Sequence, residues 1–189
     1  MKIKIIEGST RPGRFNIQPA EWFFSIAKES KDATFELVDL EKINLPLLDE
    51  KNTPLEHKYE KDHTKRWSEI IDEADGFVIV TPEYNHSIPG ALKNAIDYLY
   101  TEWNYKPVAY ISYGSAAGGS RAVEHLRGVA AEQKMYDLRE QILLPNYWEN
   151  LDENGKYKFN ERHMDAAQKM IKSVVFWAQA MKEARAKIS

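Results

Sequence analysis

Five short apolar runs recur along the chain, and stretches with the period of an amphipathic helix separate them. Runs such as FVIV at 77–80 are continuous and rich in β-branched residues, as expected for strands that are buried on both faces. The alternation predicts a β-α unit repeated five times, and therefore an α/β fold with a doubly wound, five-stranded parallel sheet and helices on both faces. The predicted strands cover residues 2–7, 34–40, 76–81, 107–113 and 138–144.

Two of the predicted helices have clear boundaries. The first places Ile17, Ala20, Phe24 and Ala27 on one stripe, with Asn16 as its expected N-cap. The last begins at about residue 160 and ends in basic residues that suit the negative end of the helix dipole. Its apolar stripe consists of Met164, Ala167, Ile171, Val174, Ala178 and Met181.

The composition bounds the class of protein. With 189 residues, 43% of them hydrophobic, the chain can fill one core and is too short for two ordinary domains, so residues 1–189 are expected to form a single domain. A net charge of -3 offers no broad field for nucleic acid. The absence of cysteine excludes disulfides and thiolate chemistry, and the five histidines lack H-E-x-x-H spacing, so no metal site is expected. No apolar run is long enough for a signal peptide or a membrane span, which predicts a cytoplasmic protein without a membrane partner.

The segment GSTRPGRFN at 8–16 follows the first strand and opens the first helix. A helix N-terminus has unpaired N–H groups and a partial positive charge, so it suits an anion. The hydroxyl of Ser9 and the guanidinium groups of Arg11 and Arg14 suit phosphate oxygens. The segment therefore predicts a phosphate site, with an ordinary surface turn as the alternative.

The details of this segment restrict the ligand. Gly8 and Gly13 have the spacing of a Walker A loop, but Arg14 and Phe15 replace its Lys and its Ser or Thr, so magnesium has no hydroxyl ligand. The G-x-G-x-x-G fingerprint of dinucleotide sites is also missing, although Asp39 ends the next strand where a ribose-binding acid would stand. These features favour a metal-free phosphate monoester, such as the tail of a mononucleotide.

A second segment, PEYNHSIPG at 82–90, follows the third strand, and Ser87 is expected to cap the next helix with Pro89 in its first turn. Tyr84 can lie against a flat ring, while Asn85 and the N–H groups of the loop can bond its polar edge. The alternative is a β-α turn punctuated by Asn and Pro.

A third segment, GSAAGGSRA at 114–122, follows the fourth strand, and its glycines allow the backbone to approach a ligand closely. A tight connection is the alternative, and a nucleophile elbow is excluded because Ser115 lies in G-S-A-A-G. In a sheet of order 2-1-3-4-5, the loops after strands 1, 3 and 4 meet at one crevice. The three segments together therefore predict a site for a mononucleotide with a large planar ring.

The chain resembles the NAD(P)H-dependent FMN reductase family of flavodoxin-like proteins, which includes flavin, quinone and azo-dye reductases. The order and spacing of these three segments carry the resemblance, which extends over nearly the whole chain. The resemblance implies hydride transfer from NAD(P)H through bound FMN to a small-molecule acceptor, with the chemistry on FMN and no catalytic side chain. It also implies that Tyr113 and Gly114 replace a turn that is usually smaller and richer in Ser or Thr. The implied FMN contacts are Ser9, Arg11, Asn16 and Arg14 at the phosphate, Pro82, Glu83, Tyr84 and Asn85 along the isoalloxazine, and Ser115 and Gly118 at its pyrimidine side.

Two alternatives stay open from the sequence: a non-enzymatic FMN electron carrier and a flavin-free interaction scaffold. The interspersed charges favour the enzyme, since a carrier usually needs a charged docking face. A surplus of aromatic residues after the third strand predicts a homodimer that buries part of this set, with a tetramer as an open alternative. The other possibility is that these rings simply cover the edges of the sheet. These residues are Tyr98, Tyr100, Trp103, Tyr105, Tyr147 and Trp148.

Overall fold

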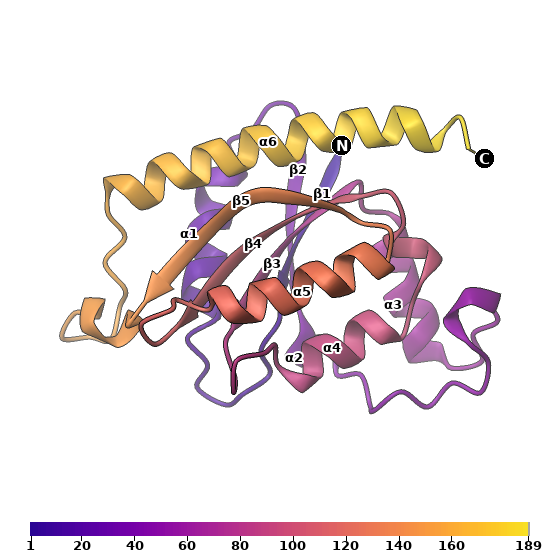
Figure 1. Ribbon diagram of the computed structural model, residues 1–189, viewed down its shortest axis with the longest axis horizontal. Coiled ribbons are helices and arrows are strands. Elements are labelled where there is room, and N and C mark those ends of the chain that lie inside the picture. The colour runs from indigo at the N-terminus through magenta and orange to yellow at the C-terminus, as the bar shows by residue number, and fades with distance from the viewer. Residues whose placement is uncertain (189) are drawn as a thin grey trace.

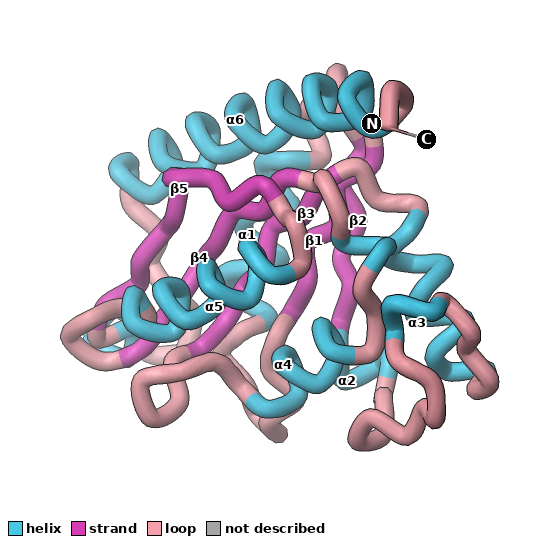
Figure 2. The backbone as a smooth tube through the Cα atoms, turned by 45° about the vertical axis from the view of Figure 1, so that its right-hand side comes forward, coloured by secondary structure: helices cyan, strands magenta, loops and turns pink. Residues whose placement is uncertain are grey.

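The structure is a computed structural model that describes residues 1–188. Its centre is a five-stranded, all-parallel sheet of order β2-β1-β3-β4-β5, covered by helices on both faces (Figures 1 and 2). Both the α/β class and the predicted strand order are confirmed. The strands are β1 (Lys2–Glu7), β2 (Thr34–Asp39), β3 (Gly76–Pro82), β4 (Pro107–Gly114) and β5 (Tyr136–Pro145).

Each face of the sheet has its own hydrophobic layer. Ile5 and Val80 point to the face that α1 and α6 cover, while Ile6 and Ile79 point to the face covered by α3, α4 and α5. Because both faces are buried, the strands read as continuous apolar runs. The helices are α1 (Ile17–Ala27), α2 (Leu40–Ile43), α3 (Asp62–Asp72), α4 (Gly90–Asp97), α5 (Ser120–Glu132) and α6 (Glu161–Arg185). Short 3₁₀ turns lie at η1 (Pro54–Glu56), η2 (Thr101–Trp103) and η3 (Tyr147–Asn150).

The predicted start of α6 near residue 160 is confirmed, whereas neither of the two residues predicted as helix caps, Asn16 and Ser87, makes a capping bond. Asn160 begins α6 and accepts a hydrogen bond from the backbone of His163, in a reciprocal capping box. Asn16 precedes α1, but its side chain makes no capping bond. Ser87 does not cap α4, which begins at Gly90, because it is held in a tight turn with Tyr84.

The buried stripes of two helices differ from the prediction: Ile17 in α1, and Ile171 and Met181 in α6, are only partly buried. In α1 the side chain that enters the core is Phe23, while Phe24 is only partly buried. In α6 Met170 is buried and Met164 is 38% exposed. The sequence pattern placed the helices correctly and misjudged the angle at which they rest on the sheet.

Part of the predicted dimer surface lies inside the monomer. Tyr98 and Trp103 are fully buried, and Trp103 packs edge-on against Trp67 and Phe77 beneath the sheet. These two rings therefore do not belong to the part of the aromatic set that a second subunit could bury, because they fill the core of the monomer. No helix within residues 1–188 combines the length and the apolar character that a membrane span requires.

Candidate functional site

A cavity of about 400 Å³ lies at the carboxyl edge of the sheet. The loops after β1, β3 and β4 contribute to it, as the strand order predicts, and a segment after β5 adds a further wall. The lining residues are Arg11, Pro12, Gly13, Arg14, Phe15, Pro82, Glu83, Tyr84, Tyr113, Gly114, Ser115, Tyr147 and Trp148.

The loop after β1 lies close to the end of β3 and to the loop that follows it. The N–H of Gly8 donates to the carbonyl of Val80 at 2.8 Å, and a Cβ at Gly8 would stand 3.0 Å from that oxygen. Ser9 is almost fully buried, and its Oγ lies 3.2 Å from the hydroxyl of Tyr84. The segments 8–16 and 82–90 are thus in direct contact at Ser9 and Tyr84.

Asn16, at the end of this loop, is the most informative polar residue of the site. It is fully buried, yet neither Oδ1 nor Nδ2 has a hydrogen-bond partner among the described residues. A buried amide without partners carries a desolvation penalty, so such groups usually form hydrogen bonds with a ligand or with ordered water. Neither Asn16 nor Ser9 lines the cavity, but Asn16 adjoins Phe15, which does, so its amide lies behind the cavity wall beside the N-terminus of α1.

The two arginines of the loop have different environments. Arg11 is exposed on the cavity rim, and within residues 1–188 its guanidinium has no ion pair. The side chain of Arg14 is only 5% exposed and donates to both carboxylate oxygens of Asp39 at 2.8 Å, as well as to Glu41. Arg14 lines the cavity but already has two anionic partners, which Arg11 lacks.

Beneath Arg14, the carboxyl of Glu7 is 5% exposed and lies opposite Asp39 in the β1-β2 ladder. Burial, reinforced by the negative charge of Asp39, raises the pKa of Glu7 to about 7, although Arg14 opposes the shift. At neutral pH the acid is therefore about half protonated, so it places less negative charge beneath the loop than an ordinary glutamate would.

The loop after β3 contains a two-residue turn. The N–H groups of Tyr84 and Ser87 donate to each other's carbonyls at 2.9 Å, and Asn85 and His86 between them have φ of 50° and 67°. Positive φ at both central positions is the type I′ geometry, which Asn tolerates well. The turn holds Tyr84 in the cavity wall, whereas the side chain of Asn85 is exposed and outside the cavity lining.

Glu83 faces α5 with its carboxylate. It accepts hydrogen bonds from the Nε of Arg121 at 2.6 Å and from the backbone N–H of Arg121 at 3.2 Å. Burial opposes ionisation, but the hydrogen bonds and positive charge of Arg121 outweigh it and lower the pKa of Glu83. Its side chain thus fixes the loop to the N-terminus of α5.

In the loop after β4, Gly114 and Ser115 line the cavity and Gly118 does not. Gly118 has φ of 59°, and a Cβ there would stand 3.1 Å from the backbone nitrogen of Pro145. A Cβ at Gly119 would come within 2.7 Å of the side chain of Ser112. These two glycines let the loop pack on β4 and β5.

The sequence interpretation missed an aromatic wall. Phe15 stacks on Tyr147 with 4.3 Å between ring centroids and meets Tyr113 edge-on at 5.0 Å. Trp148, half exposed, continues this wall from η3. Tyr147 and Trp148 stood out in the sequence only as surplus aromatic residues, because their distance from the other loops along the chain hides their position.

Comparison with known proteins identifies relatives of this chain. Residues 1–149 match the family described as NADPH-dependent FMN reductase. An NAD(P)H-dependent FMN reductase of Schizosaccharomyces pombe is 43% identical over 136 residues, which cover 71% of this chain and 68% of that protein. A 2-hydroxy-1,4-benzoquinone reductase of a Burkholderia species is 38% identical over 144 residues, covering 69% and 70% of the two chains.

The fold has solved counterparts as well. The flavoenzyme FerB of Paracoccus denitrificans, an NAD(P)H:acceptor oxidoreductase, superposes with a TM-score of 0.72 over 95% of this chain and 98% of its own, at 22% identity. This likeness establishes the flavodoxin-like fold. The sequence relatives favour the enzyme over a non-enzymatic carrier. The chain therefore belongs to the NADPH-dependent FMN reductase family, as a flavodoxin-like oxidoreductase that uses FMN and NAD(P)H.

Proposed function

We propose that the cavity at the carboxyl edge binds FMN and serves the reduction of a quinone or a similar small oxidised acceptor by NAD(P)H. The observation that carries the proposal is the meeting of three binding segments in one cavity. Bound FMN would supply the redox chemistry, by taking up hydride from NAD(P)H and returning the electrons to the acceptor. The chain's own residues bind, orient and shield it.

The residues present fit a phosphate. Among residues 1–188 the amide of Asn16 is unpaired and the guanidinium of Arg11 has no ion pair, and together with the hydroxyl of Ser9 they would hold it at the N-terminus of α1. Arg14 would contribute through its pair with Asp39, which fixes the loop's far side.

The ring of FMN would lie along the wall formed by Pro82, Tyr84 and Ser115. The backbone N–H groups of Glu83 and Tyr84 already donate to carbonyls. Those of Asn85 and His86 have no such bond among residues 1–188. Asn85 would therefore contribute its backbone donor to the polar edge of the ring.

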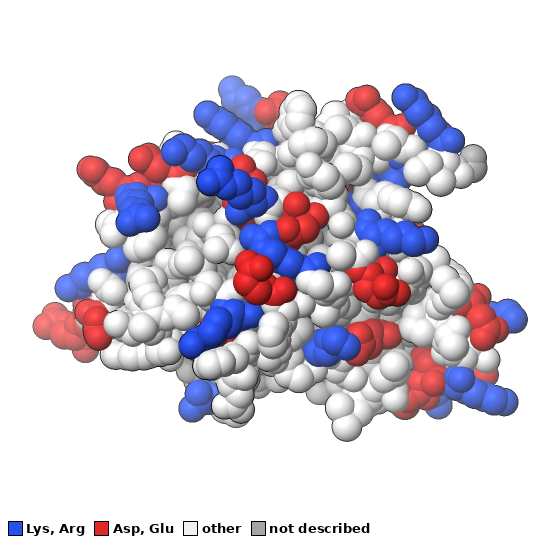
Figure 3. Space-filling view, viewed as in Figure 1, with Lys and Arg blue, Asp and Glu red and all other residues white. Residues whose placement is uncertain are grey.

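Small-molecule acceptors suit the surface. Figure 3 shows Lys and Arg side chains interspersed with Asp and Glu over the face seen in Figure 1, so this face offers no field of one sign to a charged protein partner. The test is steady-state NADPH oxidation by the flavin-stripped protein, before and after addition of FMN, with benzoquinone, an azo dye or free riboflavin as acceptor. We expect turnover only with FMN, and fastest with the quinone. Equal rates without FMN would contradict the proposal.

We also propose that the protein is a homodimer. Its interface would be formed by the segment 44–61, since Tyr98 and Trp103 are buried in the monomer. Leu47 and Leu55 in this segment are 85% and 67% exposed. The segment is nonetheless fixed, since Asn94 bonds the carbonyl of Pro46 at 2.7 Å and the N–H of Leu48 at 2.9 Å. Exposed apolar side chains on a fixed segment are typical of interfaces. A monomer in sedimentation at micromolar concentration would contradict it.

The cytoplasmic location expected from the sequence stays a prediction, which fractionation of cells expressing the tagged protein tests.

A further inference from the structure

A buried glutamate ends β1, at the point where the loop 8–16 begins. Glu7 is almost fully buried, and its Oε2 has no hydrogen-bond partner among residues 1–188. The Nε of Arg14 and both amide atoms of Asn16, in the loop itself, are also buried without a partner. No other part of the described chain gathers as many unpartnered buried polar atoms. Because such atoms cost free energy until they are satisfied, this loop is suited to a polar ligand that the chain does not supply.

Glu7 lies on the face of the sheet that α1 covers. It is two residues beyond Ile5 in β1, and Ile5 packs into the hydrophobic layer beneath α1. Asp39 stands opposite Glu7 at the end of β2, and Val80 stands opposite it in β3. A helix that follows a strand in a parallel sheet begins at the carboxyl edge, so Glu7 lies near the N-terminal end of α1. This is the end at which the proposed phosphate would bind.

The charged groups around Glu7 do not neutralise it. Those that face it are Arg14 of the loop, Asp39 of β2, Glu21 of α1 and Lys42 of α2. Arg14 is already paired with Asp39 and with Glu41. With Glu7 ionised, these acids outnumber the cations, even when Arg11 at the cavity rim is included.

A bound phosphate would make an ionised Glu7 still less favourable. A phosphate monoester carries between one and two negative charges at neutral pH, because its second pKa is about 6. Burial and the negative charge of Asp39 already raise the pKa of Glu7 to about 7. A further anion nearby raises the pKa of a carboxyl in the same direction, and burial limits the screening by water.

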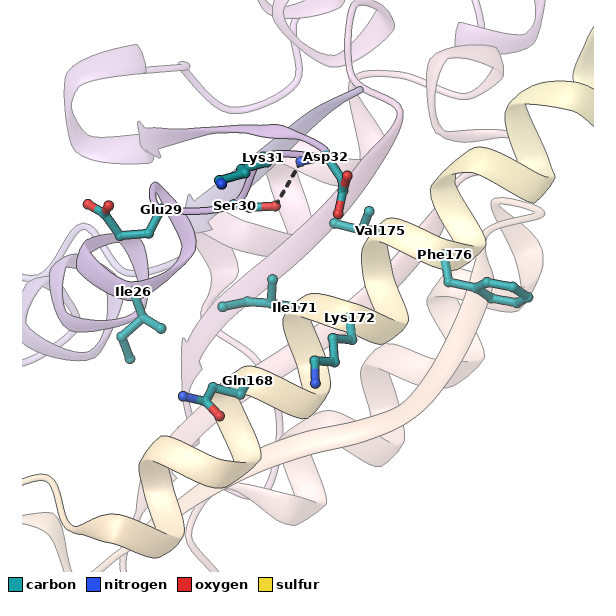
Figure 4. A pocket seen from close by; sticks show the side chains of 10 residues that line it. All are labelled: Ile26, Glu29, Ser30, Lys31, Asp32, Gln168, Ile171, Lys172, Val175 and Phe176. Carbon is teal, nitrogen blue, oxygen red and sulfur yellow. Dashed lines mark hydrogen bonds between the residues drawn. The ribbon is translucent and has the colours of Figure 1, made fainter.

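A larger groove of about 740 Å³ offers the phosphate no comparable place. It lies between α6 and the turn that follows α1, so it borders the C-terminal end of α1, where the partial charge is negative (Figure 4). Its lining combines apolar side chains with acids and lysines, namely Ile26, Ile171, Val175, Glu29, Asp32, Lys31 and Lys172. The two acids offset the two lysines, so the loop 8–16 stays the better site for an anion.

We propose that Glu7 belongs to the phosphate site and is protonated in the FMN complex, so that FMN and a proton bind together. Where Glu7 is ionised in the flavin-free protein, its carboxylate takes one proton from solvent as the phosphate enters, and no other bond forms or breaks. FMN affinity therefore falls as the pH rises above 7, because more of the protein must first be protonated. The inference rests on the proposed function, since it needs the phosphate at residues 8–16.

The test is calorimetric titration of the flavin-free protein with FMN at pH 8, in Tris and in HEPES buffer. The two buffers differ in ionisation enthalpy, so the difference in heat gives the number of protons taken up. At this pH the phosphate is almost fully ionised, and Glu7 is about nine-tenths ionised in the flavin-free protein. We expect the wild type to take up most of one proton, and Glu7→Gln to take up none. Between pH 7 and pH 8.5 the Kd of the wild type for FMN should rise about 5-fold to 15-fold, and that of Glu7→Gln should change less than about 2-fold.

Two further variants complete the experiment. Glu7→Met removes the same titrating group with an apolar side chain and should behave as Glu7→Gln does. Glu41→Gln is the matched control, because it removes a carboxylate from the same arginine and leaves Glu7 in place. It should keep the proton uptake of the wild type, and circular dichroism checks the fold of every variant.

The proposal and the proposed function fail separately. FMN binding by the wild type without proton uptake at pH 8, or wild-type uptake by Glu7→Gln, overturns the role of Glu7 and leaves the FMN site intact. A protein that gives no binding heat and no flavin fluorescence change with FMN overturns the proposed function as well.

Discussion

Replacing Asn16 by Leu should change protein stability and FMN affinity in opposite directions. In the flavin-free protein, Oδ1 and Nδ2 of Asn16 are buried and, within residues 1–188, unpaired. Leaving buried polar groups unsatisfied costs about 1–3 kcal/mol, and an apolar side chain of similar size removes that cost. The side chain makes no capping bond that the substitution would lose. We therefore expect the free energy of unfolding of the flavin-free variant to rise by about 1–2 kcal/mol.

FMN binding should respond in the other direction. A hydrogen bond to a charged group contributes about 1.5–3 kcal/mol, so losing one to the phosphate weakens binding by roughly 10-fold to 150-fold. Urea unfolding of the flavin-free protein measures the first effect, and quenching of flavin fluorescence on titration with FMN measures the second.

Asn94→Leu is the matched control for this experiment. Both polar atoms of its amide are satisfied, by Pro46 and Leu48, so this variant should lose about 1–3 kcal/mol of stability and keep its FMN affinity. The reasoning is refuted if Asn16→Leu destabilises the flavin-free protein as much as Asn94→Leu does, or if it binds FMN as tightly as the wild type.

Three further outcomes are expected. Arg11→Ala should weaken FMN binding by about 1.5–3 kcal/mol in the same titration, because it removes a charged contact to the phosphate. Riboflavin, which has no phosphate, should bind the wild type poorly for the same reason. Equal affinities of the wild type for FMN and riboflavin would contradict this. The pKa of Glu7 is raised from 4.5 to about 7 in the folded protein, so its contribution to stability is complete below pH 4.5 and is lost as the pH rises through about 7. Glu7→Gln should therefore flatten the pH dependence of the urea midpoint over this window in the flavin-free protein, and an unchanged slope would exclude Glu7 as its source. Tyr84→Ala should lower the turnover rate strongly and the free energy of unfolding only slightly. Steady-state rates with NADPH and a quinone should give parallel double-reciprocal lines, because the cavity beside Tyr84 takes one substrate after the other. Intersecting lines would instead show a ternary complex.

The sequence predicted most of the fold because strand position and burial depend on local pattern. The apolar runs gave all five strands to within two residues at each end, and glycine-rich segments marked the loops at the carboxyl edge. The caps failed where a local preference met a stronger constraint. Ser87 suits a helix cap, but the positive φ of Asn85 and His86 commits it to a turn. Asn16 lies in the core, with its amide turned away from capping.

Contacts between distant segments were beyond the sequence interpretation. The pairing of Arg14 with Asp39 depends on the exact height at which β2 ends beside β1. Likewise, the burial of Tyr98 and Trp103 depends on how η2 folds under the sheet. Residue type identified aromatic and charged groups, but only the packed structure separates those in the core from those at a surface.

The central claim is that FMN in this cavity carries electrons from NAD(P)H to a small acceptor. The most direct measurement is an anaerobic titration of the FMN-loaded protein, followed by visible absorbance. We expect one equivalent of NADPH per protein-bound flavin to bleach the oxidised spectrum, and one equivalent of benzoquinone to restore it. A spectrum that NADPH and NADH both leave unchanged, or a reduced protein that the quinone does not reoxidise, would contradict the account.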